Sequence, residues 1–200
     1  MSEEPWPPTV SLEGEHAALV PLSQDHAADL ADASAQGGLH ELWYTPVPAP
    51  KDIPAEIDRR LGLRKTGMML PFAVIDRGNQ RAVGMTTYMN VSGPNRRVEI
   101  GHTWYAKSVQ RTAINTECKI LLLTHAFEVL DCVVVEFRTH FMNFQSRAAI
   151  ERLGAKLDGI LRAQKIMADG SLRDTAAYSI IAPEWLAAKA NLTFRLRARR

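Results

Sequence analysis

A short polar segment between two apolar runs carries the residues most able to bind a ligand. The segment Gln110–Thr116 follows a strand-like run, Arg97–Tyr105, and precedes a helix-like run, Glu117–Leu130. A strand that leads into a helix N-terminus presents successive backbone N–H groups, which bind anions such as phosphate. The segment lacks the Gly-Lys-Thr of a P-loop and the three glycines of a dinucleotide fingerprint. It therefore predicts a diphosphate held mainly by backbone donors, and neither an NTP triphosphate nor NAD.

Three polar side chains near this segment could act on a bound ligand. Glu99 lies on the preceding strand-like run, and a carboxylate half-buried beside Trp104 and Tyr105 would have the raised pKa that a general base needs. Asn143 and Ser146 are spaced so that both lie on one face of the start of a helix. No nucleophile triad is present, which favours direct transfer between two bound substrates.

The elements that must position these residues follow from turn signals and periodicity. We expect strands at His16–Pro21, Leu70–Asp76, Ala82–Val91, Val98–Tyr105, Val133–Thr139, Ile160–Met167 and Leu172–Ile181. We expect helices from an N-cap at Ser23 to Gly37-Gly38, at Pro54–Lys65, at Glu117–Leu130, and from Ser146 to Leu153 before Gly154. The early strands form an antiparallel meander, whereas the crossover through the third helix makes its two flanking strands parallel. The fold class is therefore α/β, a mixed sheet with helices on both faces.

The order of these parts resembles the GCN5-related N-acetyltransferases (GNAT). The shared parts are a strand with a glutamate, a Gln-x-x-Ala-x-Asn loop, a helix, a strand and an Asn-x-x-Ser pair. The closer resemblance is to the RimJ/RimL-like branch, which acetylates N-termini of ribosomal proteins and other amines, and it covers nearly the whole chain. It implies a mostly antiparallel central sheet with a parallel strand pair splayed at the cofactor slot. Where the family loop commonly has small glycines, this chain has Ala113 and Asn115, which we interpret as a variant loop with Asn115 as the helix N-cap.

The resemblance implies acetyl-CoA as cofactor and assigns roles to the residues. Glu99 becomes the general base, Ser146 the acid that protonates the departing thiolate, and Asn143 a partner of the pantetheine amides. The loop holds the pyrophosphate, with added charge from Arg111, and a backbone N–H near Trp104 or Tyr105 polarises the thioester. The predicted cofactor contacts are Trp104, Tyr105, Gln110, Arg111, Thr112, Ala113, Ile114, Asn115, Thr116, Asn143 and Ser146.

Each role has a structural alternative that the sequence leaves open. Glu99 could be a salt-bridged strand residue with Arg97 or Arg138 as its partner. The Asn-x-x-Ser pair could serve only as helix caps. Tyr178 is an alternative acid on the last strand. For the whole protein, the alternative to catalysis is a non-catalytic acyl-CoA-binding sensor or interaction module.

The amine acceptor is expected to contact Trp43, Tyr44 and His102, since loops between scaffold elements carry specificity. By strand alternation, Glu99 and His102 face opposite sides unless a bulge intervenes, and a bulge would open the cofactor slot. The acceptor is a small-molecule amine or a protein N-terminus, and the sequence does not decide between them.

Length and composition set the remaining expectations. With 200 residues, 46% of them hydrophobic, the chain fits one domain, and we expect an irregular lead-in at 1–11, an acetyltransferase domain at 12–186 and a basic tail at 187–200. We interpret the arginines of that tail as frayed and solvated, with ribosome or RNA contact as the alternative. A net charge of +2 makes nucleic-acid binding unlikely.

Further expectations concern disulfides, metal sites and localisation. Cys118 and Cys132 are too few for a disulfide scaffold and are expected to be buried, and the histidines show no ligand spacing, so no metal site is predicted. Without a membrane-length apolar run or a signal peptide, the protein is expected to be cytoplasmic. A homodimer is possible by resemblance.

Overall fold

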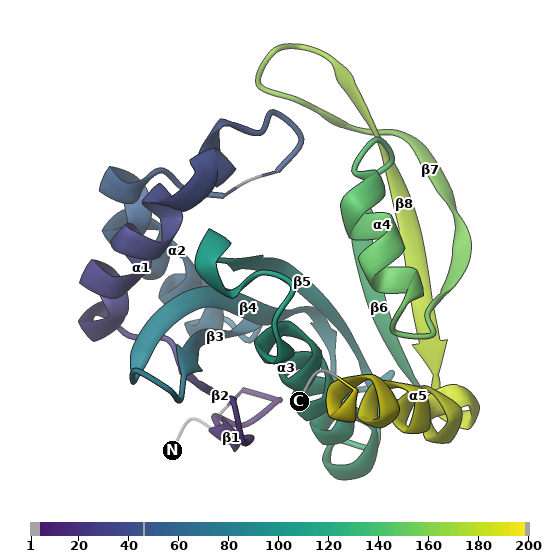
Figure 1. Cartoon of the computed structure of the whole chain (residues 1–200). Coiled ribbons are helices and arrows are strands. Elements are labelled where there is room, and N and C mark those ends of the chain that lie inside the picture. The colour runs from purple at the N-terminus through teal and green to yellow at the C-terminus, as the bar shows by residue number, and fades with distance from the viewer. Residues whose placement is uncertain (1–4, 46, 199–200) are drawn as a thin grey trace.

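The computed structural model describes residues 5–45 and 47–198, and within them an eight-stranded sheet forms the centre of the molecule (Figure 1). Its strands are β1 (Leu12–Glu13), β2 (Ala17–Pro21), β3 (Met69–Asp76), β4 (Arg81–Ser92), β5 (Arg97–Tyr105), β6 (Val134–His140), β7 (Lys156–Ile166) and β8 (Leu172–Ile181). They lie in the order β1-β2-β3-β4-β5-β6-β8-β7. Neighbouring strands are antiparallel except β5 and β6, which are parallel because α3 connects them. The mixed, mostly antiparallel sheet is the predicted fold class.

Helices cover both faces of this sheet. The α-helices are α1 (Ala27–Ala35), α2 (Ile53–Lys65), α3 (Ala113–Thr124), α4 (Phe144–Glu151) and α5 (Trp185–Arg197). The short helices are 3-10 turns at Gln24–His26, Gln36–Glu41, Pro50–Asp52, Lys107–Val109 and Ala182–Glu184, and a π-helical turn at His125–Val129. Neighbouring residues of β4 identify the faces, since Thr87 contacts α2 through Arg60, whereas the next residue, Tyr88, donates its hydroxyl hydrogen to the Leu122 carbonyl of α3. Hence α2 and α3 lie on opposite faces.

The start of α3 differs from the sequence expectation. We expected Asn115 to cap a helix that begins at Glu117, but the helix begins at Ala113 and Thr112 is its N-cap. The Thr112 hydroxyl accepts a hydrogen bond from the Ile114 N–H at 3.3 Å, so a β-hydroxyl one turn earlier takes the capping position. Asn115 therefore lies in the first turn of the helix, on its polar side.

The C-terminal segment also differs from expectation. Residues 187–197, which we expected to be part of a separate basic tail, form most of α5. The helix packs against α3 and buries Trp185, Ala188 and Leu192. An apolar i, i+3, i+7 spacing at these positions explains the packing. Arg195 is consequently held on an ordered helix beside the start of α3.

One buried carboxylate joins α3 to the N-terminal strands. Glu117 accepts hydrogen bonds from the backbone N–H groups of Glu15, His16 and Ala17 at 2.9, 2.7 and 2.7 Å. A side chain on Gly14 would collide with the Glu117 carboxyl, so the turn before β2 requires glycine. Across the described ranges, no helix combines the length and apolar character needed to cross a membrane.

Candidate active site

The site begins where the parallel strands β5 and β6 separate. Their backbone pairing covers three residue pairs and ends at Glu99 and Glu136. Beyond this point β5 stays paired with β4 up to Tyr105, and β6 stays paired with β8 up to His140, so the two strands diverge (Figure 1). In the described part of the chain, the edge of β5 that faces β6 has no strand partner after Glu99. Its backbone groups are therefore available to a ligand that lies between the strands.

Glu99 lies at this fork and is 4% exposed. Asn90 donates its amide hydrogen to Glu99 Oε2 at 2.7 Å, and Arg138 Nε lies 3.4 Å from the same oxygen. Glu99 Oε1 accepts no hydrogen bond from any residue in the described ranges. Burial raises the pKa of Glu99, and the Asn90 amide and the Arg138 charge oppose that rise. The predicted partnership with Arg138 is present, while Arg97 pairs with Glu136 instead.

A β-bulge on β5 brings His102 to the same face as Glu99. Thr87 of β4 pairs with Gly101 and Met85 pairs with Trp104, so two residues of β5 stand opposite one of β4. His102, in the bulge, has a φ of 47°. The bulge shifts the alternation by one residue, and the charge of Lys165 acts on both the Glu99 carboxyl and the His102 imidazole. Strand alternation alone would put Glu99 and His102 on opposite faces. The bulge in β5 brings both side chains to one face.

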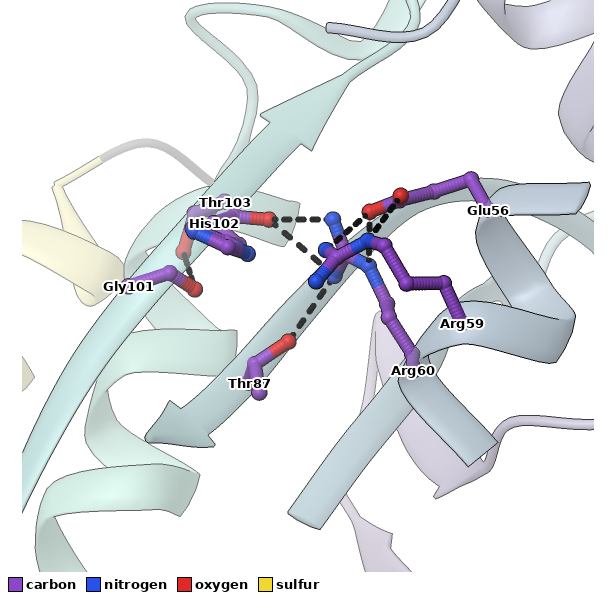
Figure 2. Close-up of polar contacts among 7 residues, drawn as sticks. All are labelled: Glu56, Arg59, Arg60, Thr87, Gly101, His102 and Thr103. Carbon is purple, nitrogen blue, oxygen red and sulfur yellow. Dashed lines mark hydrogen bonds and ion pairs between the residues drawn. The ribbon is translucent and has the colours of Figure 1, made fainter. Parts of the chain in front are cut away.

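An arginine of α2 holds the bulge in place (Figure 2). Arg60 is 1% exposed; its Nη1 donates to Thr87 Oγ1 at 2.8 Å and to the His102 carbonyl at 3.4 Å. Its Nε donates to Glu56 Oε1 at 2.7 Å, and Arg59 binds the other oxygen of that carboxylate at 2.7 Å. Burial and the nearby arginine charges lower the pKa of His102 to about 4. The His102 imidazole is therefore neutral at pH 7.

The segment after β5 ends at the N-terminus of α3. Gln110 donates its side-chain amide hydrogen to the Tyr105 carbonyl at 3.1 Å, and Arg111 adopts a left-handed backbone with φ of 64°. The chain turns sharply at Arg111, so the first-turn N–H groups of α3 point out of the helix end. The Ile114 N–H is paired with the Thr112 hydroxyl, and the other first-turn N–H groups together with the helix dipole are the donors that the predicted anion site would need.

Three helices converge at this end of α3. A small pocket there is lined by Arg111, Asn115, Thr116, Ala149, Arg152, Leu153, Leu192 and Arg195. Asn115 Oδ1 is buried and has no hydrogen-bond partner among the described residues. The three arginines of this pocket fit a polyanionic ligand at the helix end. Sequence reasoning missed Arg152 and Arg195, since only the docking of α4 and α5 brings them here.

The members of the Asn-x-x-Ser pair lie at the start of α4. Asn143 is its N-cap, with Oδ1 accepting the Ser146 N–H at 2.9 Å. Asn143 is therefore a helix cap, and its side-chain N–H₂ keeps the capacity to donate to a ligand. The Ser146 hydroxyl has no hydrogen-bond partner among residues 5–45 and 47–198. Tyr178 is 1% exposed, accepts from Arg147 Nε and donates to Glu151 Oε1, both at 2.9 Å, so its hydroxyl is already engaged.

Other predicted site residues have a packing role. Trp104 and Tyr105 are 5% and 8% exposed and belong to the core. Ile114 is 6% exposed and faces the same core, so only its backbone can meet a ligand. At the other end, Trp43 is 57% exposed, lies edge-on to Tyr44 with ring centroids 5.5 Å apart, and meets the His140 ring at 4.9 Å. The Trp43 loop therefore approaches the end of β6.

The chain is similar to a known protein family and to a bacterial relative. The family model "Acetyltransferase (GNAT) domain" matches residues 17–156. The "Putative ribosomal N-acetyltransferase YdaF" of Bacillus subtilis is 34% identical over 102 residues, which are 51% of this chain and 55% of that protein. The chain thus spans about half the length of that relative.

Solved structures extend the likeness over nearly the whole chain. A GCN5-related N-acetyltransferase from Brucella melitensis is 30% identical with a TM-score of 0.86, covering 96% of this chain and 87% of that one. RimJ of Mycobacterium smegmatis, solved in complex with CoA-disulfide, is 24% identical with a TM-score of 0.78, covering 97% and 96% of the two chains. Because RimJ is only 24% identical to this chain, its similarity supports the fold alone.

Proposed function

Since the chain belongs to the acetyltransferase (GNAT) family, we propose that it transfers the acetyl group of acetyl-CoA to a primary amine by direct attack. The observation that carries the proposal is the fork between β5 and β6, with a buried glutamate at its base and a helix N-terminus beyond it. The fork offers a place where two substrates can meet without an enzyme nucleophile. The family membership agrees with the resemblance noted from the sequence.

The residues around α3 fit the cofactor. The first-turn N–H groups of α3 and Arg111 would hold the pyrophosphate, and Arg152 and Arg195 would add charge nearby. The unpaired edge of β5 would supply backbone partners to the pantetheine arm, and the side-chain amide of Asn143 would supply another. Bound acetyl-CoA supplies a thioester whose acetyl carbon is the electrophile.

Glu99 would accept the proton that the attacking amine must lose. It is buried, its Oε1 is unengaged among the described residues, and burial raises its pKa toward the range of a useful base. The Ser146 hydroxyl would donate a proton to the departing sulfur. Tyr178 is a weaker candidate for this role because its hydroxyl already binds Arg147 and Glu151.

The acceptor would enter from the face that carries Glu99, His102 and the Trp43 loop. Trp43 and Tyr44 would form one wall, and the neutral His102 another. The name of the Bacillus relative, a ribosomal N-acetyltransferase, supports a protein N-terminus as one acceptor class. A small-molecule amine would use the same face. Dimerisation remains a prediction.

Calorimetric titration with acetyl-CoA tests the cofactor site, with desulpho-CoA and ATP as controls. We expect micromolar binding of acetyl-CoA and desulpho-CoA, which share the pyrophosphate and the pantetheine arm, and no comparable binding of ATP. Absence of acetyl-CoA binding would overturn the proposal. Equal binding of ATP would show a general phosphate site in place of a CoA site.

A further inference from the structure

Three cationic side chains surround Glu99 on the face where the acceptor would enter. Arg138 on β6 lies 3.4 Å from the Glu99 carboxylate. Arg173 on β8 is half-buried, and the Glu99 charge acts on its guanidinium. Lys165 on β7 is exposed, and its charge acts on both Glu99 and His102. The strand register places all three cations on the face of the sheet that carries Glu99, since Glu99 pairs with Glu136, Arg138 with Ala177 and Arg173 with Lys165.

These cations have little anionic compensation within the described residues. Arg173 donates from Nε to Thr175 Oγ1 at 3.1 Å and has no carboxylate within ion-pair distance there. Lys165 has neither a hydrogen bond nor an ion pair in the same ranges. Arg138 makes only two long ion pairs, 3.4 Å to Glu99 and 3.7 Å to Glu136, and its buried Nε is without a hydrogen bond. Glu136 also forms an ion pair with Arg97 of β5.

The hairpin of β7 and β8 places two of the charges side by side. Lys165 and Arg173 are directly opposite in the antiparallel register, so their side chains leave the same face of the hairpin. Like charges at opposed positions destabilise a strand pair. The neighbouring Arg162, in contrast, forms a 2.6 Å ion pair with Asp174. A repulsive pair beside a well-compensated one is expected where an anion is bound.

We propose that the amine acceptor carries a carboxylate, which Arg173, Lys165 and Arg138 bind beside Glu99; the proposal rests on the acetyltransferase function proposed above. The carboxylate would anchor the acceptor while its amine turns toward Glu99. Positive charge also makes an ammonium group less stable, so the same residues favour the neutral amine that can attack. Acceptors with a second amine, such as polyamines, would be repelled.

Matched acceptors test the proposal and distinguish its two sources, a free amino acid and an acidic peptide. Initial rates of acetylation are compared for glycine against glycinamide, and for the peptide amides Ala-Asp-Ala and Ala-Asn-Ala. We expect kcat/KM at least about tenfold higher for the acid of one pair, since a charged hydrogen bond is lost in the amide. Preference in the first pair identifies the amino acid, and preference in the second the peptide. Equal rates within both pairs would overturn the proposal.

The double variant Lys165→Gln with Arg173→Gln shows whether these residues cause the preference. We expect it to reduce the acid-to-amide ratio to about one while the KM for acetyl-CoA stays unchanged. The control is Arg162→Gln, which removes one charge from the same hairpin at a position paired with Asp174, and it should keep the ratio. A ratio unchanged in the double variant would contradict the assignment.

A binding measurement keeps the proposal testable if no tested amine is acetylated. The products N-acetylglycine and N-acetylglycinamide, and the acetylated forms of the two peptides, are titrated into the full chain with CoA present. We expect the acid of one pair to bind about tenfold more tightly, with the difference lost in the double variant. Equal affinities within both pairs would refute the anionic acceptor, whereas failure of CoA itself to bind would refute the proposed function.

Discussion

Glu99 is the single residue on which the proposed chemistry depends most. The surroundings of Glu99 have two effects on its carboxyl group. Asn90 orients the carboxylate through a hydrogen bond, and burial raises its pKa. Gly101 belongs to the same arrangement, since a Cβ there would stand 3.1 Å from Glu99 Oε1 and 2.5 Å from Met89 Sδ. The glycine leaves room for the carboxyl group at the fork.

We predict that Glu99→Gln lowers kcat/KM about 10²- to 10⁴-fold, the usual contribution of a general base. In the wild type, kcat/KM should rise with pH as Glu99 loses its proton, with an apparent pKa above the ordinary carboxyl value. The variant should lack this acidic limb and bind acetyl-CoA normally. Steady-state rates over a pH series measure both effects. A variant that keeps the limb and the rate would show that another group takes the proton.

Stability separates this catalytic effect from misfolding. The folded-state pKa of Glu99 is raised, so the folded protein binds this proton more readily than the unfolded chain. The resulting stabilisation is present at low pH and is lost as pH rises from the unfolded carboxyl pKa through the folded one. A neutral glutamine suffers no such loss and can still accept the Asn90 hydrogen bond. Urea unfolding at pH 7 should therefore find Glu99→Gln at least as stable as the wild type.

At the level of secondary-structure elements, the contact between α2 and the β5 bulge depends on a single buried side chain, that of Arg60. Arg60 serves three acceptors from a buried position: the Glu56 carboxylate, the Thr87 hydroxyl and the His102 carbonyl (Figure 2). Removal of its guanidinium leaves those acceptors without their donor. The bulge that turns His102 toward Glu99 would lose its support from α2.

We predict that Arg60→Met lowers the free energy of unfolding by about 3 kcal/mol, because it breaks a buried ion pair. Arg60→Lys should lose less, since it keeps the charge but not the planar fork that reaches both Glu56 and Thr87. Urea denaturation of the two variants measures the difference. Arg59→Met is the exposed control on the same helix, and a loss equal to that of Arg60→Met would contradict the special role of Arg60.

A charge at the N-terminus of α3 should separate ligand affinity from stability. We predict that Ala113→Asp binds acetyl-CoA about tenfold more weakly or worse, because a carboxylate in the first turn repels the pyrophosphate. The same charge interacts favourably with the helix dipole, so the melting temperature should not fall. Calorimetry and thermal unfolding give the two readouts.

A control for this variant places the same charge at the start of another helix. Ala187→Asp lies in the exposed first turn of α5 and should leave acetyl-CoA affinity unchanged. If Ala113→Asp binds acetyl-CoA as well as the control does, the pyrophosphate is not held at α3.

Sequence periodicity predicted most elements, and side-chain chemistry explains the exceptions. Strands β2 to β8, the parallel pair and the glycine after α4 follow from alternation, crossover and turn signals, whereas the two-residue β1 was not predicted; Gly154 has the expected positive φ of 95°. The predicted start of α3 is wrong because Thr112, three residues before Asn115, takes the N-cap position. Residues 187–197 are helical and do not form the expected tail, because the spaced apolar positions of α5 outweigh the arginines of its last turn.

The candidate site was only partly predictable for a related reason. Glu99 and the α3 loop are local motifs, so one sequence is enough to find them. Arg138, Lys165 and Arg173 come from three strands whose order is β6-β8-β7, and their convergence depends on that order. Arg60 extends from α2 to strands β4 and β5 of the sheet, and its local sequence gives no sign of this contact.

For the molecule as a whole, ligand binding and folding should be linked. The residues that we propose to hold the cofactor come from β5, α3, α4 and α5, which are far apart in sequence, so only the folded chain assembles them. We predict that acetyl-CoA at 100 times its Kd raises the free energy of unfolding by about 2.7 kcal/mol. For a chain of this size, the melting temperature should rise by roughly 5–10 °C.

Differential scanning calorimetry with increasing acetyl-CoA measures this shift. ATP at the same concentrations should produce a much smaller one. A melting temperature that acetyl-CoA leaves unchanged, despite a calorimetric binding signal, would indicate that the ligand binds the unfolded chain equally well.

The most direct test of the account follows CoA thiol release and acceptor mass together, using catalytic amounts of protein, acetyl-CoA and the amine acceptors described above. We predict that free CoA and an acetylated amine appear in equal amounts over many turnovers, and that Glu99→Gln abolishes most of both. Tight acetyl-CoA binding without any acetylated amine would contradict it, and would favour a non-catalytic acyl-CoA-binding module.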